Sequence, residues 1–127
     1  MKLALVSLIV RDYDEAIDWY TRVLGFHLVQ DEDQGGKRWV IIEADEGSAL
    51  LLAKAKNERE AAAIGDQHGG RVGYFLHVGD FDATCRHLIA CGVAFDEKPR
   101  AESYGKIVVF RDLYGNRWDL IETREME

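Results

Sequence analysis

The stretch RDLYGNRWDLIE, residues 111–122, combines a tight turn with a strand. Gly115 lies in the turn, where glycine accepts backbone conformations that other residues resist. After the turn, apolar and polar side chains alternate with the period of a β-strand that has two different faces. Asp119 therefore stands on one face, between Trp118 and Leu120 on the other. Four roles are open for this carboxylate: metal ligand, acid or base, polar contact for a ligand, or solvated strand residue.

The same pattern occurs earlier in the chain at a constant spacing. Gly47 and Leu52 recur as Gly115 and Leu120, an offset of 68 residues. The same offset maps Val10, Asp12, Tyr13 and Asp14 onto Val78, Asp80, Phe81 and Asp82. These matches fall at a strand end, a helix start and a hairpin turn, which is typical of an internal structural repeat. We therefore expect two similar halves.

Each half predicts one strand, one helix and three further strands. In the first half Asp12 and Glu15 have the spacing of a helix N-terminal capping box, and Gly25 suits the helix end. Strands are expected at 3–10, 26–31, 37–44 and 48–54. The second half predicts a helix at 81–91 and strands at 72–79, 93–96, 106–111 and 117–123. The sequence thus predicts one α+β domain over 1–127, with β-α-β-β-β modules at 1–54 and 71–127 and a linker at 55–70.

Composition excludes several classes of protein. The net charge of -7 opposes the counterion release that drives nucleic-acid binding. The longest apolar run, at 3–10, is too short to span a membrane, and no signal peptide is recognisable. Cys85 and Cys91 match neither a zinc-site nor a disulfide spacing. We expect a cytoplasmic protein that binds neither nucleic acid nor membrane.

Two motifs, VRDYDEAIDWYTRVLGF at 10–26 and FRDLYGNRWDLIE at 110–122, resemble the vicinal oxygen chelate superfamily. This superfamily includes glyoxalase I, fosfomycin- and bleomycin-resistance proteins and extradiol dioxygenases. The resemblance covers nearly the whole chain. It implies that the paired modules curl as a mixed sheet around a cleft, with the helices outside. It also implies a homodimer.

The resemblance also implies where metal-dependent members hold a divalent ion. Three of the four corresponding ligand positions are Leu5, Leu51 and Gly73, and only Asp119 carries a donor. A protein metal site needs about three side-chain ligands with N, O or S donors. We therefore expect neither a divalent metal nor another cofactor.

Alternation along the strands indicates which side chains share the cleft with Asp119. Arg117 lies on its side of the same strand, and Phe75 and His77 share one side of the strand at 72–79. Asp119 and His77 are the candidate catalytic pair, since histidine titrates near neutral pH. Each also has a structural explanation, as an arginine-paired carboxylate and a satisfied core histidine. Ser7 is a candidate ligand contact or a hydroxyl bonded to backbone.

Phe75, Arg117 and the remaining candidates are ligand contacts. Arg38 and Trp39 begin a strand and could clamp an anionic or planar ligand, although Trp39 and Trp118 also suit a core or dimer interface. Tyr104 and Arg111 occupy positions where the resemblance implies substrate contacts. By the repeat offset Arg111 corresponds to Glu43, so an ion pair between the halves is the structural alternative.

Two functions remain open. The first is a binding protein that sequesters a small, planar or drug-like molecule, which requires no catalytic group. The second is a metal-independent or atypical-metal enzyme, of lyase, isomerase or dioxygenase type, in which Asp119, alone or with His77, moves a proton. A small-molecule ligand is expected in both cases.

Overall fold

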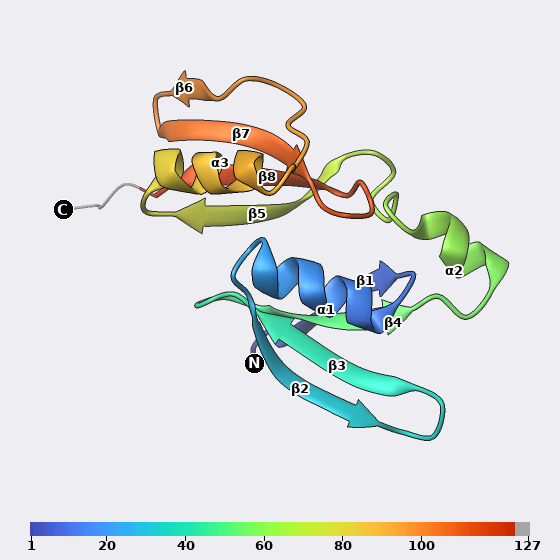
Figure 1. Ribbon diagram of the computed structural model, residues 1–127. Coiled ribbons are helices and arrows are strands. Elements are labelled where there is room, and N and C mark those ends of the chain that lie inside the picture. Colours follow the sequence, from blue (N-terminus) through green and yellow to red (C-terminus); the bar gives the residue numbers. More distant parts are fainter. Residues whose placement is uncertain (124–127) are drawn as a thin grey trace. The chain divides into compact units, whose positions relative to one another are not determined.

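The computed structural model describes residues 1–123 and divides them into two compact units, one ending at Ile64 and the other beginning at Gly65 (Figure 1). The first unit contains β1 (Leu5–Val10), α1 (Tyr13–Arg22), β2 (His27–Asp33), β3 (Arg38–Glu43), β4 (Ala49–Lys54) and α2 (Glu58–Ala63). The second contains β5 (Val72–Val78), α3 (Phe81–Ala90), β6 (Arg100–Glu102), β7 (Gly105–Arg111) and β8 (Arg117–Glu122).

The internal repeat is visible in the topology. The first sheet has the strand order β1-β4-β3-β2 and the second has β5-β8-β7-β6. In each, the first and last strands of the module pair in parallel and the other neighbours are antiparallel. The predicted α+β class with tandem β-α-β-β-β modules is therefore confirmed, and the strands form two separate open sheets.

Residues matched by the 68-residue offset have matched structural roles. Asp12 and Asp80 are both helix N-caps, whose carboxylates accept hydrogen bonds from the backbone N–H of Glu15 at 2.9 Å and Ala83 at 3.0 Å. Gly47 and Gly115, in the hairpin turns before β4 and β8, have φ values of 97° and 93°. The repeat thus reflects shared requirements for helix starts and turns.

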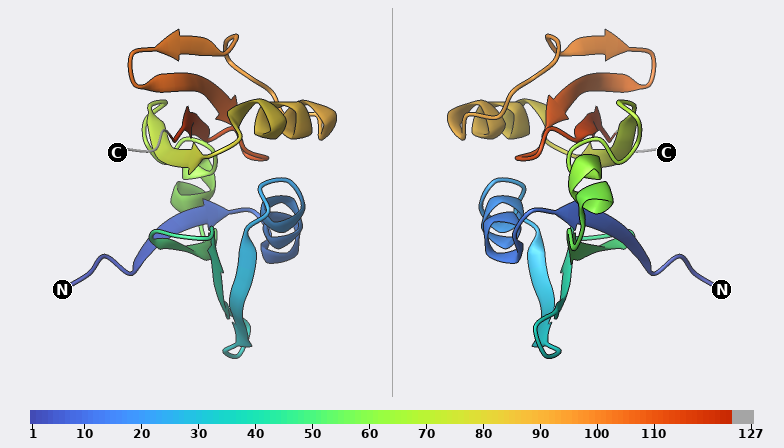
Figure 2. Two further views of the ribbon diagram at one scale, coloured as in Figure 1. Left: turned by 90° about the vertical axis from the view of Figure 1, so that its left-hand side faces the viewer. Right: turned by 90° about the vertical axis from the view of Figure 1, so that its right-hand side faces the viewer.

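Each unit buries the face of its sheet that its helix contacts. In the first, Leu8, Val40 and Leu52 are aligned by the strand register and buried on the face that α1 contacts. In the second, Leu120 and Val108 are aligned and buried, and α3 contacts β8. Figure 2 shows α1 and α3 beside their sheets. Since side chains alternate along a strand, the neighbouring residues face away from the helices.

One predicted strand is wrong. The segment 93–96 forms only an isolated bridge between Phe95 and Phe110, and the sixth strand is instead Arg100–Glu102. Pro99 immediately precedes this strand, where its missing N–H removes no hydrogen bond from the ladder. A short apolar run does not by itself distinguish a strand from a segment packed beside one.

Within residues 1–123, no helix is both long and apolar enough to cross a membrane.

Candidate functional site

A cleft of about 640 Å³ opens on the first unit, beside the face of the sheet that points away from α1. This volume lies within the range of about 300–1,000 Å³ that small-molecule sites occupy. Trp39 precedes the buried Val40 and is itself half-buried, so its indole faces the cleft. The lining is Ile9, Tyr13, Gly36, Lys37, Arg38, Trp39, Leu51, Leu52, Ala53, Lys54, Ala55, Lys56 and Glu60.

The wall beside Trp39 is held by Arg38. Its guanidinium pairs with Asp31 at 2.7 Å and with Asp14 at 2.9 Å, and lies 5.1 Å from the centre of the Tyr13 ring. Hydrogen bonding from Arg38 lowers the pKa of Asp31, and Asp31 and Asp14 raise the pKa of Arg38. The two carboxylates therefore hold the guanidinium in place. Arg38 positions the cleft wall, and its charge is already compensated.

Three lysines at the cleft were not among the candidates from the sequence. Lys37 comes just before β3, Lys54 ends β4 and Lys56 follows it. Antiparallel pairing of β3 with β4 brings the start of one strand to the end of the other. The sequence signals were the basic pairs KR at 37–38 and KAK at 54–56, which become one group only when the strands are paired.

Ser7 lies on the same sheet as the cleft but is not among its lining residues. It aligns with Leu51 in the register of β1 and β4, and it is exposed on the face that points away from α1. Arg38 and Trp39 are therefore the candidates that the structure brings together in the first unit.

Asp119 is half-buried on the face of the second sheet that points away from α3. It aligns with Phe75 on β5 and Val109 on β7, on the face opposite Leu120. Burial raises the pKa of the Asp119 carboxyl, while the charge of Arg100 lowers it, that of Glu97 raises it and that of Arg117 lowers it. The carboxyl is thus drawn out of water without a strong ion-pair partner, which is one of the arrangements found in catalytic acids.

His77 and Phe75 share this face with Asp119. His77 is exposed and lies two residues beyond Phe75 on β5, next to the strand of Asp119. The Phe75 ring is 62% exposed. In the described residues no hydrogen bond joins His77 to Asp119.

Arg111 and Arg117 converge on one carboxylate. Asp96 accepts from Nε of Arg111 at 2.6 Å and from Nε of Arg117 at 2.8 Å, and both arginines lower its pKa, Arg111 the more strongly. Arg117 also donates to the backbone oxygen of Gly70 at 3.0 Å. Arg111 therefore has an ion-pair partner within the second unit. These residues border a polar hollow of about 330 Å³.

Tyr104 lies apart from this group. It occupies the turn between β6 and β7 and is 54% exposed.

The positions that correspond to the metal ligands of the superfamily do not fit a metal. Leu5 and Leu51 on the first sheet and Gly73 on β5 supply no side-chain donor, and Asp119 supplies one carboxylate. In residues 1–123 there is also no group of three or more His, Cys, Asp or Glu side chains that could hold a metal ion. A single carboxylate falls short of the donor set that such a site needs.

Residues 2–120 match the family described as the Glyoxalase/Bleomycin resistance protein/Dioxygenase superfamily. The chain belongs to this superfamily. An uncharacterized protein of Shewanella frigidimarina strain NCIMB 400 is 40% identical over 126 residues, which cover 96% of this chain and 93% of the relative. These matches confirm the resemblance carried by the two sequence motifs.

Solved structures with a similar fold extend the comparison. The crystal structure of UcmS2 is 32% identical with a TM-score of 0.81, and the match covers 95% of this chain and 97% of that one. TnmS3, an antibiotic binding protein from Streptomyces sp. CB03234, is 27% identical with a TM-score of 0.77, covering 98% and 97% of the two chains. The solved structures similar to this chain thus include an antibiotic binding protein.

Proposed function

We propose that this protein binds and sequesters a small planar molecule in the cleft of its first unit. The observation that carries the proposal is the combination of a cavity of suitable volume with the indole of Trp39 and the apolar side chains of Ile9 and Leu51. An indole beside an apolar floor suits the stacking of a flat ring. The similarity to the antibiotic binding protein TnmS3 supports binding as the activity.

The test is calorimetric titration with 2-naphthamide, a neutral planar probe of modest size. We expect saturable binding by the wild-type protein. Trp39→Leu removes the stacking surface and should weaken affinity about tenfold, which corresponds to about 1.4 kcal/mol. Trp19→Leu is the matched control, because Trp19 belongs to α1 and is absent from the cleft lining. The absence of saturable binding, or equal losses in both variants, would contradict the proposal.

A second candidate function is metal-independent proton transfer by Asp119, with His77 as a possible partner. Burial raises the pKa of the half-buried Asp119 carboxyl, and this shift toward the proton-carrying form favours a role as an acid. If this function is correct, Asp119→Asn abolishes turnover of any substrate identified while leaving ligand affinity within about twofold. Retention of full turnover by that variant would exclude the role of Asp119.

We further propose that binding requires no divalent ion, because the donors at the superfamily ligand positions are missing. Elemental analysis of untagged protein, purified without chelator and exposed to zinc, nickel, manganese and iron, should find less than about a tenth of an ion per chain. Stoichiometric, tightly held metal would overturn this and direct mutagenesis to His77 and Glu43.

A further inference from the structure

The basic side chains of the first unit are distributed unevenly between paired and unpaired environments. Arg11, Arg22 and Arg38 each form an ion pair with a nearby carboxylate. By contrast, within residues 1–123 no carboxylate lies within ion-pair distance of Lys37, Lys54, Lys56 or Arg59. The three lysines line the cleft, and Arg59 lines an adjoining hollow of about 340 Å³. In the first unit, the basic side chains without an ion-pair partner therefore lie mainly at the cleft and the adjoining hollow. Lys2 also has no ion-pair partner among the described residues but lines neither of them.

Among residues 1–123, Glu60 supplies the one carboxylate of the cleft lining, and neutral donors occupy its oxygens. Oε1 of Glu60 accepts from the backbone N–H of Lys56 at 3.2 Å, and Oε2 accepts from the side-chain amide of Asn57 at 3.4 Å. Glu60 borders both the cleft and the adjoining hollow. Counted with Arg38 and its two carboxylate partners, Asp31 and Asp14, the three lysines and Glu60 leave one net positive charge, so the cleft keeps a small excess of positive charge.

This local excess is opposite in sign to the whole chain, whose net charge is -7. Like charges gathered at one opening repel one another, and a bound anion would relieve that repulsion while attracting all of them. Lysine stems can also lie along an apolar ligand while the ammonium groups reach its charged end. The lining thus provides an apolar floor around Trp39 and a cationic rim.

We infer that the ligand of this cleft is a planar aromatic anion, such as an aromatic carboxylate or sulfonate, with its ring at Trp39 and its negative group at Lys37, Lys54 and Lys56. This inference rests on the proposed binding function and adds the charge of the ligand. The ring gains by leaving water, and the anionic group is recognised by the lysines near the solvent-exposed rim.

The experiment compares 2-naphthoate with 2-naphthamide, which has nearly the same shape and no charge, by calorimetry at pH 7. In dilute buffer the wild-type protein should bind the carboxylate about tenfold more tightly than the amide. One exposed ion pair contributes a factor of up to about five, and more than one lysine is expected to contact the carboxylate. The preference should shrink in 0.5 M sodium chloride, because salt screens exposed charges.

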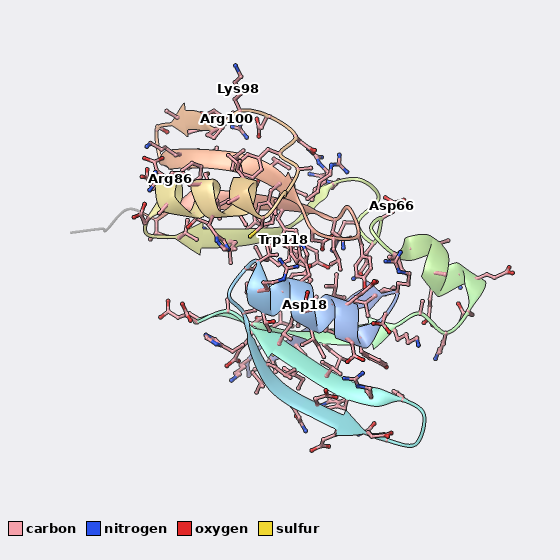
Figure 3. The ribbon with its side chains drawn as sticks, in the orientation of Figure 1. Asp18, Asp66, Arg86, Lys98, Arg100 and Trp118 are labelled. Atoms are coloured by element: carbon pink, nitrogen blue, oxygen red, sulfur yellow. The ribbon has the colours of Figure 1, made fainter. Side chains whose placement is uncertain are left out.

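The double variant Lys54→Gln/Lys56→Gln should lose most of the preference for the carboxylate and keep its affinity for the amide. Lys2→Gln/Lys98→Gln is the matched control, because it removes the same charge from two exposed lysines outside the cleft. Lys98 projects outward from the loop before β6 (Figure 3). This control should keep the preference.

The outcomes separate the two proposals. Equal affinity of the wild-type protein for both probes, or a preference that survives in Lys54→Gln/Lys56→Gln, overturns the charge of the ligand and leaves the binding function standing. If both double variants lose the preference for the carboxylate equally, the inference about the charge of the ligand is also overturned. The preference would then depend on the net charge of the protein and not on the lysines of the cleft. Failure of both probes to bind contradicts both proposals.

Discussion

Asp112 explains most of the motif RDLYGN at the level of single residues. Its side chain is 6% exposed, and its carboxylate accepts from the backbone N–H of Tyr114 and Asn116, at 3.0 and 2.9 Å. It also accepts from the Asn116 amide at 2.9 Å and from the Trp118 indole at 3.4 Å. One carboxylate therefore organises the turn that precedes the strand of Asp119, and the motif is primarily structural here.

Asp112→Ala should lower the free energy of unfolding by at least about 2 kcal/mol, because it leaves buried donors without an acceptor. Urea unfolding at pH 7 measures this. The control is Asp45→Ala in the corresponding turn of the first unit, whose side chain is 92% exposed and should cost no more than about 0.5 kcal/mol. Similar losses in both variants would contradict the role of Asp112.

Whereas the Asp112 carboxylate stabilises the fold, the ionised Asp119 carboxylate is expected to lower the free energy of unfolding. Because its pKa is raised above the ordinary value of 3.8, the folded protein favours the protonated carboxyl, and the ionised form costs stability at any pH above the folded pKa. Asp119→Asn removes this cost. The variant should be more stable than wild type at pH 7, and the difference should disappear as the pH falls toward 3.8.

The measurement for Asp119 is urea unfolding of both proteins at pH 7, 5.5 and 4. Each unit of pKa elevation corresponds to about 1.4 kcal/mol at the plateau. A variant less stable than wild type at pH 7 would mean that the ionised carboxylate is stabilised in the fold.

At the level of elements, the turn after α2 is fixed by Gly65. Its φ is +77°, and a Cβ at this position would collide with the backbone oxygen of Tyr114 in the β7–β8 turn. Gly69 also has positive φ, at +65°, but a Cβ there meets nothing within 4 Å. The two glycines share conformational strain, and they differ only in the space around them.

Gly69→Ala should cost about 1–2 kcal/mol from the left-handed backbone alone. Gly65→Ala should cost about 2 kcal/mol more, since a backbone carbonyl cannot move aside as a flexible side chain can. Melting temperatures of both variants test the difference. Equal shifts would mean that the approach of Gly65 to Tyr114 is not maintained in solution.

Most elements of the fold could be predicted from the sequence because local signals agree with the tertiary structure. Asp12 and Asp80 mark helix starts through their own capping bonds, and Gly47 and Gly115 mark turns that need positive φ. The prediction of a strand at 93–96 failed because this segment pairs with β7 only through the Phe95–Phe110 bridge and the backbone hydrogen bonds beside it, which is too short a ladder for a strand. Packing partners are not encoded in a local run.

The site was less predictable for the same reason. Trp39 could be recognised as an aromatic residue at the head of a strand, whereas the group of Lys37, Lys54 and Lys56 depends on which strands pair. The facing of Arg111 depends on Asp96, which lies 15 residues away in the chain. The charge of the cleft therefore depends on which strands pair. The net charge of the chain alone would suggest a negative cleft.

At the level of the whole molecule, we expect a homodimer, as the superfamily resemblance implies. Large apolar side chains are exposed in both units, including Leu28 and Val29 on the edge strand β2 and Phe75 on β5. Exposed apolar groups of this kind often mark protein contacts. Light scattering at micromolar concentration should give twice the chain mass of 14.4 kDa. A mass of one chain would exclude the dimer at that concentration.

The ring stack of the second unit provides an optical signal for that unit. The Trp118 indole lies 4.6 Å from the Tyr74 ring at 24° and 5.9 Å from the Phe110 ring at 21°. Fixed aromatic packing gives near-ultraviolet circular dichroism, which disappears when side chains lose their fixed arrangement. A spectrum of Trp118→Phe subtracted from that of wild type would isolate this band. Its loss on heating would then report melting of the second unit separately from the unit that contains Trp39.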